Sequence, residues 1–225
     1  MRIIPVINCQ DFDEVKERFH IAQEILFGTG SESREIDERD GWIHIDIADG
    51  GFTKGYSTWR NPQEFSQLKR NPHLKIEVHI MMSEPEEVIS EWLALGVHRI
   101  IFHLESVANV ETITGMCAES GVETMLALKP ETPVAHAFQY LPLVNGCQLL
   151  AVTPGPANQQ MAPHIIEKLE ALHAQHPDLL IEIDGGINPE TAQQCAKAGA
   201  SQVVSGSYIF HDDNPAAAYQ RLQEI

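Results

Sequence analysis

Two histidines and two aspartates occupy positions from which they could bind a metal ion. His44 and Asp46 lie two residues apart in the run IHIDIADGG, His79 lies in KIEVHIMM, and Asp184 lies in IEIDGG. Each run is typical of a short strand. A spacing of two residues puts His44 and Asp46 on the same face of their strand. Two imidazoles and two carboxylates suit Zn, Fe(II), Mn or Co better than Ca or Mg, and the sequence leaves the identity of the metal open.

Each of these side chains also has an ordinary structural interpretation. A single histidine is often a hydrogen-bonded residue of the core or its rim. A single aspartate often forms a salt bridge with Arg or Lys on a neighbouring strand, but neither aspartate run contains Lys or Arg. Four such residues at one predicted rim favour a metal site over four unrelated structural roles.

The elements that must position these residues alternate regularly along the chain. Short β-branched runs predict eight strands, at 3–7, 42–47, 75–80, 99–103, 123–128, 147–152, 180–183 and 202–205. Amphipathic segments predict helices at 11–26, 62–69, 85–95, 107–120, 133–141, 162–175, 189–198 and 214–223. Proline begins several helices, and Gly96, Gly121 and Gly199 each follow one, as expected for left-handed caps.

Eight repeats of strand and helix predict a parallel sheet, and the even repeat favours a closed (β/α)8 barrel over an open sheet. The 225 residues match one such domain, which we expect to span 1–225. The polar stretch 28–40 (GTGSESREIDERD) is interpreted as an exposed insertion before the second strand. Active sites of these barrels form at the carboxyl ends of the strands, so the four candidate ligands are expected to converge there.

Composition restricts the partners and the setting of the protein. The chain is 43% hydrophobic and has a formal net charge of −17, which repels nucleic acid and anionic lipid headgroups. Its four cysteines form no CxxC pair, and the N-terminus does not resemble a signal peptide. The apolar runs are shorter than the roughly 20 residues that a membrane helix needs. We therefore expect a soluble cytoplasmic protein that binds neither nucleic acid nor membranes.

Six blocks of sequence resemble the ribulose-phosphate 3-epimerase family, in the family's order and over nearly the whole chain. HIDIADGGF at 44 resembles its HxDxMDGxF block, and VHIMMSEP at 78 resembles its HLM block. FHLES at 102, LALKPETP at 126 and IDGGINPET at 183 resemble its blocks at the fourth, fifth and seventh strands. VSGSYIF at 204 resembles its AGSAIF block. The resemblance implies a TIM barrel.

The resemblance also implies a reaction. His44, Asp46, His79 and Asp184 would bind one divalent metal ion, and the two aspartates would also act as acid and base. Such an enzyme inverts C3 of a ketose phosphate, here D-ribulose 5-phosphate to D-xylulose 5-phosphate. Removing a proton beside a carbonyl builds negative charge on oxygen, and a metal stabilises the resulting enediolate. The aspartates, on the second and seventh strands, would carry protons on opposite faces of the substrate.

A phosphate site is expected after the last three strands. Barrels commonly bind phosphate there through backbone N–H groups, although a glycine pair can also simply turn the chain. The expected substrate and phosphate contacts are His79, Gly155, Pro156, Ala157, Asn158, Gly185, Gly186, Gly206 and Ser207. Supporting contacts around the metal ligands are expected from Asn8, Met81, His103 and Glu105.

Departures from the family leave the choice of substrate open. The family's PGFGGQ loop is Pro154-Gly155-Pro156-Ala157-Asn158-Gln159 here, which predicts a stiffer or repositioned loop because two glycines and one N–H donor are lost. The family's strand-one serine falls on Val6, and two methionines that shield the metal fall on Ala48 and Leu150.

On these residues, one alternative to the pentulose-phosphate epimerase stays open and two are disfavoured. Another ketose phosphate, such as a hexulose 6-phosphate, could react on the same ligands. A non-catalytic metal-bound sugar-phosphate binding protein is disfavoured by the unaltered Asp46 and Asp184. Related decarboxylating barrels have a DxKxxD pattern, whereas position 48 is Ala. A homo-oligomer is compatible with the family, but no residue pattern indicates one.

Overall fold

The computed structural model describes residues 1–28 and 41–225. Its elements are β1 (Arg2–Ile7), α1 (Phe12–Phe27), β2 (Gly41–Ala48), α2 (Pro62–Phe65), β3 (Leu74–Met81), η1 (Pro85–Glu87), α3 (Ile89–Ala94), β4 (Arg99–His103), α4 (Val110–Glu119), β5 (Glu123–Leu128), η2 (Val134–His136), η3 (Leu141–Leu143), β6 (Gly146–Leu150), α5 (Ile165–Gln175), β7 (Leu180–Asp184), α6 (Pro189–Lys197), β8 (Gln202–Ser205), α7 (Ser207–Phe210) and α8 (Pro215–Gln223). The predicted insertion at 28–40 lies outside the described residues, apart from Gly28.

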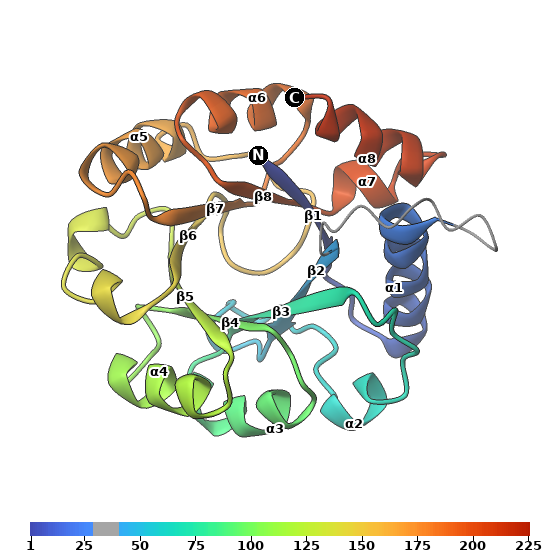
Figure 1. Ribbon diagram of the computed structural model, residues 1–225, viewed down its shortest axis with the longest axis horizontal. Coiled ribbons are helices and arrows are strands. Elements are labelled where there is room, and N and C mark those ends of the chain that lie inside the picture. Colours follow the sequence, from blue (N-terminus) through green and yellow to red (C-terminus); the bar gives the residue numbers. More distant parts are fainter. Residues whose placement is uncertain (29–40) are drawn as a thin grey trace.

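The eight strands form a closed parallel barrel in sequence order, with β8 paired to β1. Figure 1 looks along this barrel and shows the helices arranged around it. The predicted (β/α)8 architecture is therefore confirmed. The strands β4, β5 and β8 have the predicted bounds, and the other five differ by one or two residues at an end. No helix in the described ranges is both long and apolar enough to cross a bilayer.

The helix predictions were less accurate between β2 and β6. The helix expected at 62–69 ends at Phe65, after which i to i+3 hydrogen bonds tighten the chain into turns. The helix expected at 85–95 is divided into η1 and α3. The prediction of a helix at 133–141 is wrong, because two 3₁₀ turns, η2 and η3, lie there instead. Pro133 provides no side-chain cap, and Pro142 disfavours the α conformation at Leu141.

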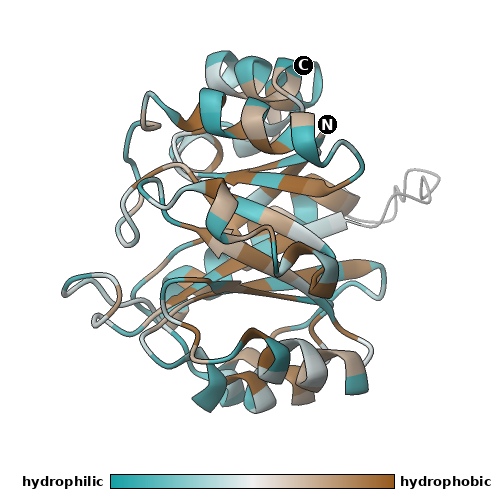
Figure 2. Cartoon of the chain, turned by 90° about the vertical axis from the view of Figure 1, so that its left-hand side faces the viewer, coloured by the Kyte–Doolittle hydropathy of each residue, from teal (hydrophilic) through white to brown (hydrophobic). Residues whose placement is uncertain are grey.

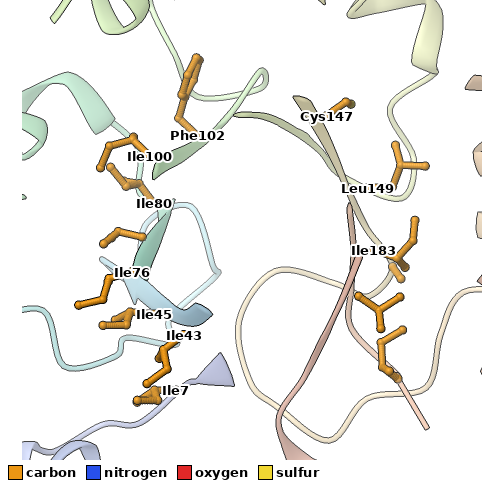
Figure 3. Packing of buried hydrophobic residues seen from close by; sticks show 14 of the residues in the cluster. Ile7, Ile43, Ile45, Ile76, Ile80, Ile100, Phe102, Cys147, Leu149 and Ile183 are labelled. Carbon is orange, nitrogen blue, oxygen red and sulfur yellow. The ribbon is translucent and has the colours of Figure 1, made fainter. Parts of the chain in front are cut away.

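The hydrophobic core lies between the barrel and its helices. Figure 3 shows labelled residues of this core, among them Ile45, Ile80 and Leu149, pointing away from the barrel axis. They pack against the apolar faces of the helices, such as Val15 and Phe19 of α1. In the side view the strands are mainly brown, whereas the helices carry bands of teal and brown, as amphipathic helices should (Figure 2). The alternate residues of each strand are thereby left to fill the interior of the barrel.

The middle of the barrel interior is unusually polar. Glu77 on β3 is the register partner of both His44 on β2 and Arg99 on β4, and all three side chains are buried. Arg99 Nη1 donates to Glu77 Oε2 at 2.6 Å, and its Nε and Nη2 donate to Glu123 Oε2 at 3.0 and 2.7 Å. On the opposite wall Glu182 of β7 accepts hydrogen bonds from Gln148 and Gln202. A layer of paired charges and amides therefore lies directly below the carboxyl ends of the strands.

We expect replacement of Arg99 to destabilise the fold. Arg99→Leu leaves Glu77 buried without its cation, and breaking a buried ion pair from one side costs about 3–5 kcal/mol. Urea denaturation should show this loss as a lower midpoint. The matched control is Glu123→Gln, because the Glu123 side chain is 47% exposed, and an exposed pair contributes no more than about 1 kcal/mol. Equal midpoints for Arg99→Leu and the unaltered protein would contradict the assignment.

Candidate active site

The register of the strands brings the four predicted ligands together at the carboxyl end of the barrel. Asp46 and His79 are direct partners on β2 and β3, and His44 precedes Asp46 by two residues on the same inward face. Asp184 is the last residue of β7. The two histidines are fully buried, and each aspartate is 7% exposed. One potential ligand atom of each residue lies within 4.8 Å of those of the other three, so the predicted convergence is confirmed.

The short distances centre on one oxygen of Asp46. Its Oδ1 lies 3.2 Å from His44 Nε2 and 3.0 Å from His79 Nδ1. His79 Nδ1 also lies 3.3 Å from Asp184 Oδ2. These atoms belong to three different strands, and no segment of local structure could have assembled them.

The Nδ1 nitrogen of His44 forms a hydrogen bond with the polar layer beneath the site. His44 Nδ1 donates to Glu77 Oε1 at 2.8 Å, inside the polar layer. Burial raises the pKa of Glu77, but the hydrogen bond and charge of His44 and the charge of Arg99 outweigh it, so the pKa is lowered and the carboxylate is ionised. An ionised carboxylate only accepts hydrogen bonds, which places a proton on Nδ1 of His44. Nε2 is then the nitrogen that faces the site.

The other nitrogen of His79 is held by a second chain of hydrogen bonds. His79 Nε2 lies 2.9 Å from His103 Nε2, and His103 Nδ1 lies 3.1 Å from Glu105 Oε2. Burial, as the largest cause, lowers the pKa of His103 to about 4, so this ring is neutral at pH 7. It donates from Nδ1 to Glu105 and therefore accepts at Nε2 from His79. His79 Nδ1 is thereby the nitrogen that faces the aspartates.

Glu105 is itself fixed by the start of the β5–η2 segment. Its Oε1 accepts from the backbone N–H of Lys129 at 2.7 Å and from the hydroxyl of Thr132. Burial raises the pKa of Glu105, but the bond from His103 and the other donors outweigh it and lower the pKa to about 2. His103 and Glu105, predicted from sequence as supporting residues, thus occupy that position, and neither lines the cavity above the site.

The ionisation of the site shows why it favours a cation. Burial lowers the pKa of both His44 and His79, but neighbouring carboxylates outweigh it and raise both pKa values above the ordinary 6.5. Burial raises the pKa of Asp46, yet hydrogen bonds from the two imidazoles lower it overall. Without metal, the imidazoles therefore hold protons between ionised carboxylates.

A divalent cation fits in the place of these protons. Ligand bonds of about 2.1 Å hold neighbouring ligand atoms about 3.0–3.4 Å apart. The three distances around Asp46 Oδ1 and His79 Nδ1 run from 3.0 to 3.3 Å. Two carboxylates balance the charge of the ion, and each imidazole has its second nitrogen fixed by a hydrogen bond, as is usual for histidine ligands of metals. The donor set is the nitrogen and oxygen set expected from the sequence.

A cavity of about 800 Å³ opens above the four ligands. Asp46 and Asp184 both line it, whereas His44 and His79 lie beneath its floor. The predicted contacts that line it are Asn8, Met81, Gly155, Pro156, Ala157, Asn158, Gly185, Gly186, Gly206 and Ser207. Val6 and Leu150, two of the departures from the family, line it as well.

The loop between β6 and α5 crosses the mouth of the barrel in Figure 1. Asn158 adopts a left-handed φ of 61°, a conformation that Asn tolerates better than most residues. Gln159 Nε2 donates to the carbonyls of Thr153 and Pro156 at 2.8 and 2.7 Å. A Cβ on Gly186 would lie only 2.4 Å from the backbone N of Met161, so this loop packs directly on the turn after β7.

Sequence reasoning missed Glu77 and Tyr56. Glu77 has the same spacing from His79 that His44 has from Asp46, so the period of two could have identified it as an inward residue. Tyr56 lies in the segment between β2 and α2 and donates from its hydroxyl to Asn8 Oδ1 at 2.6 Å. No spacing in the sequence indicates that contact.

Comparison with known proteins identifies relatives of this chain. Residues 22–210 match the model of the Ribulose-phosphate 3 epimerase family. A ribulose-phosphate 3-epimerase of Chlamydia trachomatis is 33% identical over 192 residues, which cover 82% of each chain. One from Candida glabrata is 28% identical over 205 residues, covering 85% of this chain and 83% of the relative.

Solved structures share the fold at low sequence identity. A mutant tryptophan synthase α-subunit from Pyrococcus furiosus superposes with a TM-score of 0.68 at 17% identity, covering 100% of this chain and 98% of that one. This likeness supports the barrel architecture alone.

We expect the stability of the metal-free protein to fall as the pH rises above 6.5. Groups whose pKa values are raised in the folded state contribute stability that is fully present below their ordinary pKa and lost as pH rises through the raised value. His44 and His79 have raised pKa values, and burial raises the pKa of Glu182 to about 8 with the same sign. Urea midpoints of chelator-treated protein over about pH 6–9 measure the effect.

The metal-saturated protein is the control for this pH series. Because a bound cation replaces the imidazole protons, stabilisation by metal should increase over the same pH range. A chelated protein that becomes more stable as pH rises through this interval would show that the imidazoles are not protonated between carboxylates.

Proposed function

The chain belongs to the ribulose-phosphate 3-epimerase family, and from this membership we infer that it is an isomerase that inverts C3 of a pentulose phosphate. We propose D-ribulose 5-phosphate and D-xylulose 5-phosphate as its substrate pair. The observation that carries the proposal is the placement of Asp46 and Asp184, which both line one cavity while both lie beside His79. Two carboxylates that approach a cavity from β2 and β7 suit a reaction that needs two proton carriers.

We propose that His44, Asp46, His79 and Asp184 hold one divalent metal ion, of a kind drawn from Zn, Fe(II), Mn and Co. When bound, such an ion supplies electrostatic stabilisation of the negative charge that develops on a substrate oxygen. Glu77 keeps His44 in one tautomer, and His103, held by Glu105, does the same for His79. Preorganised ligands of this kind need little rearrangement when charge develops.

The two oxygens of Asp46 have separate roles in this proposal. Oδ1 lies 3.2 Å from His44 Nε2 and 3.0 Å from His79 Nδ1, and Oδ2 accepts a hydrogen bond from Asn8. Oδ2 is therefore the atom that exchanges a proton with C3 from one side of the substrate. Asp184 exchanges a proton from the other side, so that removal on one face and delivery on the other inverts the carbon.

The phosphate group is proposed to bind at the far end of the same cavity. Gly185 and Gly186 follow β7, Gly206 and Ser207 follow β8, and Gly155 to Asn158 of the β6–α5 loop line the same cavity. Backbone N–H groups there bind an anion in spite of the net charge of −17, because they act at contact distance. Pro156 has no N–H to contribute.

We propose a cytoplasmic setting for this enzyme and a small sugar phosphate as its partner. All four cysteines are free and buried, and a relative from Oryza sativa is named a cytoplasmic isoform. Burial of the thiols in a reduced state agrees with such a compartment.

Purified protein, saturated in turn with each candidate metal, should interconvert ribulose 5-phosphate and xylulose 5-phosphate. Its metal content after expression without added metal should approach one ion per chain. A hexulose 6-phosphate is the control substrate, since Val6 and the altered β6–α5 loop both line the cavity and bear on substrate choice. Reaction of the hexulose phosphate alone would reject the pentulose assignment, and lack of bound metal under every supplement would reject the metal centre.

We expect Asp46→Asn and Asp184→Asn each to lower kcat by about 10²–10⁴-fold, because each removes one proton carrier. Proton exchange distinguishes the two variants. In D₂O, each variant should still exchange the C3 proton of the one epimer whose hydrogen faces its remaining carboxylate. Full loss of exchange for both epimers in both variants, with metal retained, would contradict a mechanism with two separate carriers.

A further inference from the structure

Asn8, at the end of β1, contacts the one oxygen of Asp46 that is free of the imidazoles. Asn8 Nδ2 donates to Asp46 Oδ2 at 2.8 Å. The same amide group donates to the carbonyl of Gly155 in the β6–α5 loop at 3.2 Å. One side chain therefore joins the floor of the cavity to the loop above it.

Tyr56 holds the other end of this amide. Asp46 and the Gly155 carbonyl only accept hydrogen bonds, so the N–H end faces them, and the Tyr56 hydroxyl donates to Asn8 Oδ1 at 2.6 Å. Tyr56 also packs beside Gly155, since a Cβ on that glycine would lie 3.4 Å from Tyr56 Cβ. Reversal of the amide would place its oxygen against Asp46 Oδ2 and the Gly155 carbonyl, which only accept, and would break both hydrogen bonds that Asn8 Nδ2 donates.

Asp46 needs such an anchor for a geometrical reason. The terminal torsion of an aspartate is broad, so the rotamer of Asp46 by itself sets the plane of its carboxylate only loosely. A partial rotation about the last bond would move both oxygens at once, Oδ1 away from the imidazoles and Oδ2 away from Asn8. The hydrogen bond from Asn8, the residue that follows β1, opposes this rotation because it holds the second oxygen from a different segment of the chain.

We propose that Asn8 is a positioning residue for Asp46, and that Tyr56 holds the Asn8 side chain in the place from which it bonds Asp46 Oδ2. The inference rests on the proposed function, since it concerns the proton carrier of that reaction. Asn8 also couples the position of this oxygen to the β6–α5 loop through Gly155. Neither residue is a proton carrier, because the amide of Asn8 does not ionise and Tyr56 does not line the cavity.

The test is Asn8→Leu, which keeps the volume of the side chain and removes its hydrogen bonds. Loss of a partner that orients a metal ligand costs about 10–100-fold in activity, and we expect that loss in kcat with a smaller change in KM. Tyr56→Phe removes one hydroxyl and should lower kcat about 2–10-fold. Tyr56→Phe keeps the aromatic ring and so should fold. It therefore still tests the hydrogen bond between Tyr56 and Asn8 if Asn8→Leu does not fold.

Proton exchange in D₂O separates positioning of Asp46 from general damage. In Asn8→Leu, C3 exchange should fall by about 10–100-fold for the epimer whose hydrogen faces Asp46, and by less than about threefold for the other. The stoichiometry of bound metal should stay unchanged, since Asp46 Oδ1 keeps its neighbours. A merely structural defect would lower both exchange rates together.

Gln10→Leu is the matched control. Gln10 Nε2 donates to the carbonyl of Ser57 at 3.3 Å, so it joins the same two segments of chain as Asn8 and Tyr56 without touching Asp46. Its kcat and both exchange rates should equal those of the unaltered enzyme.

The outcomes distinguish this inference from the function on which it rests. Unaltered protein that exchanges no C3 proton with either pentulose phosphate overturns the proposed function and the inference with it. Unaltered protein that exchanges both epimers, together with an Asn8→Leu variant whose two rates are unchanged or fall equally, overturns the inference alone.

Discussion

Each buried imidazole at this site has two nitrogens, and both need a partner where water does not reach. One nitrogen of His44 and one of His79 face the aspartates, so the opposite nitrogens must bond to the protein. Glu77 provides the partner for His44 and the His103–Glu105 pair provides it for His79. These carboxylates select the tautomers, and the tautomers direct two lone pairs at one point. The rest of the barrel interior is arranged around that requirement.

Glu77, which bonds to His44, is itself a buried carboxylate and needs a cation beside it. An isolated buried carboxylate is costly, so Arg99 pairs with it and extends to Glu123 at the surface. Such a polar interior does not stabilise the fold as an apolar one would. The barrel tolerates it because its large hydrophobic core lies outside the strands, against the helices, where residues such as Ile45 and Ile80 are fully buried. Stability and chemistry are thus assigned to opposite faces of the same strands.

The two ends of the cavity differ in how closely they follow the family. The four ligands keep the residue types on which the proposed chemistry depends. Val6 and the β6–α5 loop line the proposed substrate cavity, and in this loop Asn158 takes a left-handed conformation and Gln159 bonds back to its own loop. Asn8 connects the two ends, since it contacts both Asp46 and Gly155. A change in the loop is therefore transmitted to the carboxylate through one side chain.

The sequence by itself determined the order of the strands, the barrel and the four candidate ligands. Alternation with a period of two suffices to assign an inward face, and the carboxyl ends of parallel strands meet at one rim. Local pattern did not determine the segments 62–69 and 133–141, where short-range turns replaced expected helices. At 133–141 no side chain caps the segment and Pro142 follows it, whereas the helix expected at 62–69 is capped by Asn61 but extends only to Phe65.

Only the tertiary structure decided which atoms meet. The register between β2 and β3 sets His44 opposite Glu77 and Asp46 opposite His79, and a shift of one residue would separate both pairs. The contacts of Tyr56 with Asn8 join segments 48 residues apart. Hydrogen bonds form only within narrow limits of distance and angle. Those limits are met by the simultaneous packing of eight strands and their loops, which no single segment of sequence specifies.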